Sequence, residues 1–172
     1  MLRDVSLHLA SQGKTVSVIA RGILRLNSLV EASRTLDGHI NSIQVDYKDS
    51  VILEAKLKQA VKVFGPISLA VCWIHRNAPE APYVVAESII KETMSFRYFD
   101  ILGSTAASRR YKVFRREATL RKFESLMYRK IILGVIIEND VPRWLTHREI
   151  SRGVIKAIKR DEYCYLVGEV PP

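Results

Sequence analysis

Residues 67–74 read ISLAVCWI, an almost uninterrupted apolar run that follows Gly65-Pro66, a pair that ends helices. A short apolar run without polar alternation is typical of a strand covered by helices on both faces, as in a parallel sheet. The run is also far too short to cross a bilayer. It therefore predicts a buried strand of an α/β domain.

The chain on both sides of this run alternates between helical and strand patterns. Apolar spacing and turn residues predict helices over 2–9, 26–36, 53–64, 79–94 and 146–158, and strands over 15–20, 40–45, 98–102, 131–137 and 163–167. The basic segment 109–130 fits neither pattern cleanly and is interpreted as helical around 117–127.

Capping residues support several of these boundaries. Asp49 or Ser50 is a candidate cap for the helix over 53–64, and Gly13 is expected to end the first helix. Thr146 and Glu149 have the spacing of a capping box, in which each residue satisfies a backbone group of the other.

Strands that alternate with helices of this length predict a doubly wound, mostly parallel, Rossmann-like α/β sheet with helices on both faces. A (β/α)8 barrel needs eight such units and a longer chain. With 172 residues and no internal repeat or linker, the chain is expected to form one domain over 1–172.

The formal net charge is +9, and much of the excess lies in residues 109–130. This segment is interpreted either as a solvated helix face or as a patch that faces phosphate. Nucleic acid is disfavoured as a partner, because no recognition helix or aromatic platform accompanies the charge.

Cys72 and Cys164 lie in apolar stretches, as buried reduced thiols do. With neither a signal-peptide pattern nor a membrane-length apolar run, the cytoplasm is the expected compartment.

The order of helix, strand ending at Arg21, strand ending at Asp46 and strand ending near Trp73 resembles the cofactor half of the short-chain dehydrogenases/reductases. In that family a first strand and a glycine-rich turn come directly before the first helix. Met1 aligns with the beginning of that helix, so the chain resembles an atypical member without its first strand and glycine-rich loop. The resemblance implies a nicotinamide dinucleotide as cofactor and a small molecule as substrate.

The first strand of a Rossmann sheet is central, so its absence predicts two half-sheets with unpaired backbone edges. One hypothesis is that the natural protein continues upstream and that Met1 is an internal methionine. The competing hypothesis is that the sheet closes up or takes a strand from another chain. In the second case the protein would be a homo-oligomer. The mass of the native N-terminus distinguishes the two hypotheses.

The resemblance places the adenosine end of the cofactor beside Arg21, Arg25, Asp46 and Tyr47. Arg21 stands where the family reads the ribose, and an arginine there accommodates a 2′-phosphate, so NADP is expected over NAD. Arg25 is a candidate second contact. Asp46 resembles the acid beside the adenine ring, with Tyr47 next to it. The alternative interpretations are a solvent-facing arginine and an ordinary loop carboxylate.

The segment from Cys72 to His75 takes the place of the family's Asn-Asn-Ala-Gly element and departs from it completely. Trp73 and Ile74 are candidates to line the cofactor, and His75 is a candidate to face a substrate. A structural role is the alternative for the histidine. Because no Cys or carboxylate stands at ligand spacing from His75, no metal site is expected.

The resemblance places the catalytic residues after the strand over 98–102. Ser104 takes the position of the family's catalytic serine, and Tyr111 with Arg115 approximates its Tyr-x-x-x-Lys pair. In the family the lysine lowers the pKa of the tyrosine, which then passes a proton during hydride transfer. Arginine supplies positive charge but stays protonated and binds differently from lysine.

Two functions therefore remain open at this stage. One is an atypical oxidoreductase that binds NADP(H) and acts on a small carbonyl or alcohol. The other is a non-catalytic dinucleotide-binding or regulatory module. The fold alone does not distinguish them, because function depends on the residues of the site.

Overall fold

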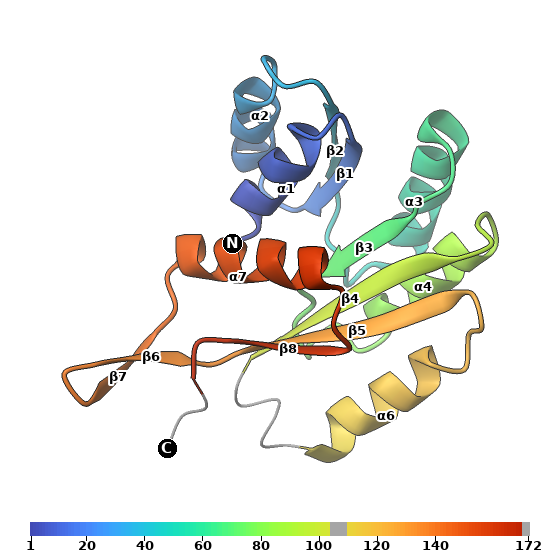
Figure 1. The fold of residues 1–172 in the computed structure, drawn as a ribbon. Coiled ribbons are helices and arrows are strands. Elements are labelled where there is room, and N and C mark those ends of the chain that lie inside the picture. Colours follow the sequence, from blue (N-terminus) through green and yellow to red (C-terminus); the bar gives the residue numbers. More distant parts are fainter. Residues whose placement is uncertain (104–109, 170–172) are drawn as a thin grey trace. The chain divides into compact units, whose positions relative to one another are not determined.

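A computed structural model describes residues 1–103 and 110–169, with the side chains of 1–103 and 115–169. Contacts between Cα atoms divide the chain into two compact units. The N-terminal unit comprises Leu2–Pro66 and His75–Glu92, and the C-terminal unit comprises Met1, Ile67–Ile74 and Thr93–Pro172. Each unit has its own parallel sheet (Figure 1). The single-domain organisation stays a prediction.

The N-terminal unit is built on two parallel strands, β1 (Thr15–Ala20) and β2 (His39–Gln44), which pair in register from Thr15 with His39 to Ala20 with Gln44. Its helices are α1 (Arg3–Ala10), α2 (Ile23–Ala32), α3 (Ser50–Phe64) and α4 (Ala81–Ile90). The small core between α1, α2 and the sheet centres on Ala10, Leu29 and Ile40.

The C-terminal unit contains a four-stranded sheet in the order β3-β4-β5-β8, with all pairs parallel. The strands are β3 (Leu69–Cys72), β4 (Phe96–Gly103), β5 (Leu126–Leu133) and β8 (Cys164–Val167). Helices α6 (Arg110–Leu120) and α7 (His147–Arg160) lie on opposite faces of this sheet (Figure 1). Parallel strands with helices on both faces confirm the predicted fold class.

The predicted division into two separate sheets is present. In the part of the chain that the structure describes, β1 pairs with β2 alone and β3 pairs with β4 alone. Each of these two strands therefore has one edge without a strand partner. This is the arrangement that the absence of a central first strand predicts.

Two local predictions were wrong. The helix expected around 117–127 is α6 at Arg110–Leu120, and β5 already begins at Leu126. The strand expected over 131–137 is divided at Gly134, after which β6 (Val135–Glu138) and β7 (Val141–Trp144) form an antiparallel hairpin.

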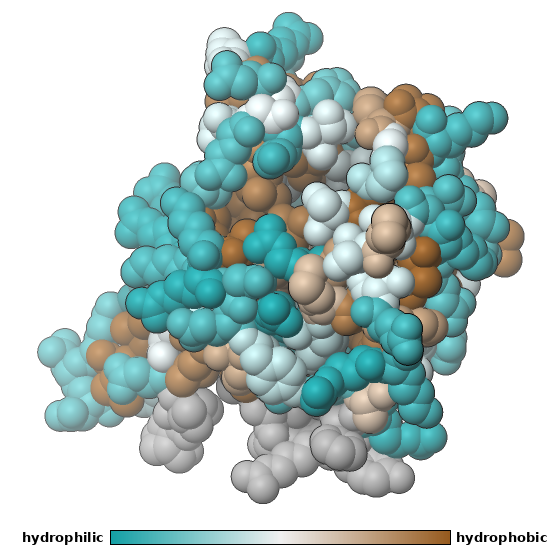
Figure 2. All heavy atoms as spheres, turned by 45° about the vertical axis from the view of Figure 1, so that its right-hand side comes forward, coloured by the Kyte–Doolittle hydropathy of each residue, from teal (hydrophilic) through white to brown (hydrophobic). Residues whose placement is uncertain are grey.

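The hairpin has a physical cause that apolar patterning does not reveal. A Cβ on Gly134 would lie 2.0 Å from the carbonyl oxygen of Glu169, so only glycine allows this close approach. Asn139 and Asp140 form the turn with positive φ values of 52° and 62°, as a two-residue hairpin turn requires. Apolar (brown) residues at the lower left of Figure 2 mark the hairpin, where Val141 is exposed.

The helix boundaries follow the predicted caps. Asp49 caps α3, because its side chain accepts a hydrogen bond from the Ile52 N–H at 3.0 Å. Thr146 and Glu149 form the predicted capping box at the beginning of α7. None of the described helices combines the length and the apolar content that a membrane crossing requires.

Helix α7 packs on the sheet through a glycine, which yields a testable prediction. A Cβ on Gly153 would lie 2.4 Å from Cγ1 of Val167, a β-branched side chain with little rotamer freedom. We expect Gly153→Ala to lower the free energy of unfolding by about 1–3 kcal/mol, although alanine is the better helix former. Urea unfolding measures this change.

Arg152→Ala, at the exposed neighbouring position of the same helix, is the control and should change the free energy of unfolding by less than about 0.5 kcal/mol. A Gly153→Ala protein as stable as the parent would contradict the described packing of α7 on β8.

Candidate functional site

The turn between β1 and α2 concentrates positive charge. Arg21 follows the last residue of β1, and Gly22 is the N-cap of α2, with φ −86° and ψ 99°. The side chain of Arg25 runs back beside Gly22, since a Cβ there would meet Arg25 Cδ at 3.9 Å. The first turn of α2 contains no acidic residue. Two guanidinium groups thus flank a helix N-terminus, whose free N–H groups and dipole favour an anion.

The end of β2 brings a carboxylate beside this turn. The Val45 N–H donates to the Ala20 carbonyl at 3.1 Å and extends the pairing by one residue. Asp46 then lies with Oδ2 3.6 Å from Nη1 of Arg21, and its Oδ1 accepts the Lys48 N–H at 3.1 Å. The two side chains are 71% and 39% exposed, so water screens this pair and a ligand can reach both groups.

A shallow pocket of about 390 Å³ lies at the carboxyl ends of these two strands. It is lined by polar and apolar groups together: Arg21, Gln44, Val45, Asp46, Asp49 and Ile52. The Gln44 side chain donates to the Arg21 carbonyl at 3.3 Å and ties the two strand ends together. The carboxyl ends of parallel strands are where ligands bind in open α/β sheets. The donor set suits a phosphate, a ribose hydroxyl or the amino group of a base.

A larger groove of about 500 Å³ runs along the outer edge of β2, beside α3. Its lining includes Asn41, Gln59 and Phe64, and none of the sequence-predicted site residues. No arginine and no free helix N-terminus lies in it. The smaller pocket is therefore the better candidate for a ligand with phosphate.

The structure brings some of the predicted cofactor residues together in one unit, and others belong to the second unit. Arg21 and Asp46 line one pocket, and Arg25 lies beside the same turn. Tyr47 is half-buried and does not line the pocket. Trp73 and Ile74 follow β3 in the C-terminal unit and are half-buried, whereas His75 is exposed and belongs to the N-terminal unit. Their roles stay predictions.

The predicted catalytic residues are only partly described. Ser104 comes directly after β4 but lies outside the described residues. Tyr111 belongs to α6, with its side chain outside the described part. Arg115 is exposed on the same helix. The catalytic assignment therefore stays a prediction.

Four residues of the pocket were missed by sequence reasoning, namely Gln44, Val45, Asp49 and Ile52. Gln44 and Val45 belong to the predicted strand over 40–45, and Asp49 was recognised only as a candidate helix cap. Ile52 had a weaker signal, since an apolar residue in the first turn of a helix is usually assigned to the core. Ile52 is instead 48% exposed and forms an apolar wall of the pocket.

No protein-family model matches the sequence, and no curated protein matches it significantly. Solved structures do match. A hydroxysteroid dehydrogenase from Escherichia coli has a TM-score of 0.72 at 11% identity, over 96% of this chain and 90% of that chain. A putative short-chain dehydrogenase/reductase from Burkholderia xenovorans has a TM-score of 0.71 at 10% identity, over 96% and 87%. The chain has the fold of the short-chain dehydrogenases/reductases.

A third structure of this fold was solved with a ligand. A metagenomic short-chain oxidoreductase in complex with NADP has a TM-score of 0.66 at 16% identity, over 99% of this chain and 91% of that chain. At such identities the likeness establishes the short-chain dehydrogenase/reductase fold and leaves the chemistry to the residues of the site.

The exposure of the Arg21–Asp46 pair predicts that Arg21 contributes little to stability. We expect Arg21→Gln to change the free energy of unfolding by less than about 0.5 kcal/mol, because exposed ion pairs are screened by water. Asp49→Ala should lower it by about 1 kcal/mol, because the cap of α3 is lost. Chemical denaturation of the two variants checks both values, and an equal loss in both would contradict this division of roles.

Proposed function

We propose that the protein is an atypical oxidoreductase of the short-chain dehydrogenase/reductase type that binds NADP(H) and acts on a small carbonyl or alcohol. The observation that carries the proposal is the pocket at the carboxyl ends of β1 and β2, which Arg21 lines one residue before the N-cap of α2. The fold shared with solved oxidoreductases supports the reaction class.

The preference for NADP rests on charge. An adenosine ribose carries a 2′-hydroxyl in NAD and a 2′-phosphate in NADP. A carboxylate at the end of β1 would repel the phosphate, whereas Arg21 stands there and Arg25 lies beside it. Guanidinium groups bind phosphate through charge-assisted, often bidentate hydrogen bonds. Asp46, at the other side of the pocket, is suited to accept a hydrogen bond from the adenine amino group.

The nicotinamide end of the site rests on the resemblance alone. Trp73 and Ile74 are proposed to line the cofactor, and His75 to face the substrate. Ser104 and Tyr111 are proposed to bind the substrate oxygen, with Arg115 supplying the positive charge that favours ionised Tyr111. When bound, the cofactor would supply or accept the hydride, and the tyrosine would move the proton at the substrate oxygen.

One observation favours the second candidate function, a non-catalytic dinucleotide-binding module. The position of the family's lysine is taken by Arg115, which is exposed on α6. Arginine has a pKa too high to act as a proton carrier, and its geometry differs from that of lysine. A protein with this replacement can retain cofactor binding without turnover.

Cofactor binding is tested by fluorescence titration of the protein with NADPH and NADH. We expect NADPH to bind more tightly, and Arg21→Gln to weaken NADPH binding by roughly 10- to 100-fold, since a charge-assisted hydrogen bond contributes about 1.5–3 kcal/mol. NADH binding should change little. Arg34→Gln, an exposed arginine just beyond the other end of α2, is the matched control.

The same titration is repeated on a chain extended upstream by a strand and a glycine-rich turn, whose N–H groups are expected to strengthen binding of the pyrophosphate. Equal affinity for NADPH and NADH in both chains, or an Arg34→Gln effect as large as that of Arg21→Gln, would refute the NADP assignment.

Turnover separates the two candidate functions. Oxidation of NADPH is followed at saturating cofactor with a panel of small aldehydes and ketones, in the parent and in Tyr111→Phe. The oxidoreductase proposal expects turnover that Tyr111→Phe lowers by about 10²- to 10⁴-fold, the typical contribution of a general acid. Binding without turnover of any carbonyl would favour the non-catalytic module.

A further inference from the structure

A carboxylate lies in the middle of the sheet of the C-terminal unit. Asp100 belongs to β4, is 1% exposed, and is flanked along the strand by the fully buried Phe99 and Ile101. Carboxylates are almost never buried to this degree unless a cation pairs with them. The partner of Asp100 is Arg116 of α6, whose Nη2 lies 2.9 Å from Asp100 Oδ2.

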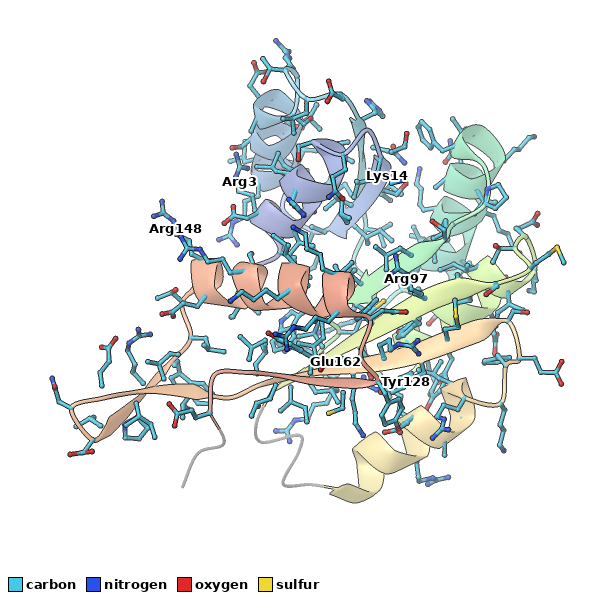
Figure 3. All side chains as sticks on the ribbon, in the orientation of Figure 1. Arg3, Lys14, Arg97, Tyr128, Arg148 and Glu162 are labelled. Carbon is cyan, nitrogen blue, oxygen red and sulfur yellow. The ribbon has the colours of Figure 1, made fainter. Side chains whose placement is uncertain are left out.

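The hydrogen bonds of this carboxylate are unevenly distributed. Arg116 and the Tyr128 hydroxyl, which donates at 3.0 Å, both bind Oδ2. Oδ1 is buried and has no hydrogen-bond partner among the described residues. Tyr128 lies on the α6 side of the sheet, whereas Arg97 reaches the Ile158 carbonyl of α7 on the other side (Figure 3). Within the described part of the chain, one oxygen of this buried carboxyl group thus has no donor.

An ionised carboxylate in this position is costly. Desolvation of a buried charge can exceed the Coulomb energy regained from its partner, most of all where hydrogen-bond capacity is left unused. Accordingly, burial raises the pKa of Asp100 to about 6, although the Arg116 guanidinium and the Tyr128 hydroxyl act in the opposite direction. The protonated form of Asp100 is therefore favoured inside the fold, compared with a carboxyl in water.

Lys130 of β5, the register neighbour of Asp100 on the other side, is paired with Glu117, and apart from the paired guanidinium the remaining described neighbours carry no positive charge to Asp100. Glu117 of α6 raises the pKa of Asp100 further, and its own carboxylate is paired with Lys130 of β5 at 3.2 Å. Cys72 of β3 is the register neighbour of Asp100, and burial raises the pKa of its thiol to about 12, so it stays neutral. Burial also raises the pKa of the Tyr98 hydroxyl, which stays protonated as well.

Polar contacts join the described part of α6, residues 115–120, to the sheet. Arg116 binds Asp100 of β4, and the adjacent Glu117 binds Lys130 of β5 and accepts a hydrogen bond from Tyr163, just before β8. Among the described side chains of this helix, Leu120 is the buried apolar one. Helix α7, on the opposite face, buries Ile150, Val154 and Ala157.

We propose that Asp100 and Arg116 are positioning residues that anchor α6, and that the anchor is strongest when Asp100 is protonated and weakens when Asp100 becomes ionised. The direction follows from linkage. A carboxyl with a higher pKa in the docked state than in water stabilises docking below its pKa in water, and this contribution is lost as the pH rises through about 6. Opening of α6 hydrates Asp100 and so becomes easier at neutral pH.

The inference stands on the described contacts of α6 and does not require that the protein is an enzyme. If the proposed function holds, it has a consequence for activity. Tyr111 and Arg115 belong to α6, so the same ionisation would change how firmly these two residues are held.

The proposal is tested by hydrogen exchange of the intact protein between pH 5 and pH 7.5, with rates corrected for the intrinsic pH dependence. We expect the protection of the α6 amides at 117–120 to fall by about tenfold across this range. This factor follows from a pKa of 3.8 for the carboxyl in water and of about 6 in the docked state. The amides of α7, on the opposite face of the same sheet, should show no comparable change.

Variants separate the anchor from general destabilisation. Asp100→Asn should abolish the pH dependence of α6 protection, whatever its absolute level. Tyr128→Phe, a mild substitution, should move the midpoint to higher pH, because a hydrogen bond that lowers the pKa of Asp100 is lost. Arg116→Gln should move it further in the same direction, since Arg116 is the larger of the two influences.

Asp161→Asn is the matched control, because Asp161 also pairs with an arginine, Arg129, but is half-exposed and lies at the end of α7. It should leave the profile of α6 unchanged. Protection that stays flat or rises with pH in the parent, or a pH dependence that survives Asp100→Asn, would overturn the proposal. Neither result bears on cofactor binding, which the NADPH titration tests separately.

Discussion

The parallel pairing of β1 with β2 is the interaction on which the candidate site depends. Because Ala20 pairs with Gln44, strands β1 and β2 end side by side. The residues that follow them therefore bring the Arg21 guanidinium and the Asp46 carboxylate together. A slip of one residue would turn every side chain of β2 to the other face and separate Arg21 from Asp46. The site therefore depends on backbone hydrogen bonds rather than on the exposed ion pair.

The same backbone rule explains the open edges of the sheets. Strands inside a sheet satisfy their N–H and C=O groups on both sides, whereas β1 and β3 are each paired on one side in the described chain. Both strands carry apolar or half-buried side chains, as strands inside a sheet do. The resulting order, with β1-β2 in one sheet and β3-β4-β5-β8 in another, corresponds to a Rossmann sheet that lacks its central strand.

Much of this fold was predictable from local sequence signals. The strand at Thr15–Ala20 and the capping box at Thr146 follow from β-branched runs and from capping chemistry, which act within a few residues. The need for glycine at 134 was not predictable, because it comes from the approach of Glu169, more than thirty residues away in the sequence. Arg21 and Asp46 were found through strand ends, whereas Ile52 required knowledge of which helix face stays exposed.

The Asp100 anchor shows another limit of local reasoning. A charged residue inside the strand sequence FRYFDILG is a visible anomaly, but its partner Arg116 stands within a run of basic residues that resembles a solvated face. Only the packing of α6 on the sheet singles out Arg116 from its neighbours. Part of the basic segment thus serves the interior of the C-terminal unit, where a buried carboxylate needs a counter-charge.

The pocket proposed to bind adenosine lies entirely within the N-terminal unit, so it can be tested without the glycine-rich turn or the proposed catalytic residues. The most direct measurement is an NMR titration of the isotope-labelled protein with adenosine 2′-monophosphate, with adenosine as the reference ligand. We expect amide shifts confined to residues 21–25 and 44–52, and tighter binding of the phosphorylated ligand. Shifts elsewhere, or equal binding of the two ligands, would contradict a 2′-phosphate site at Arg21.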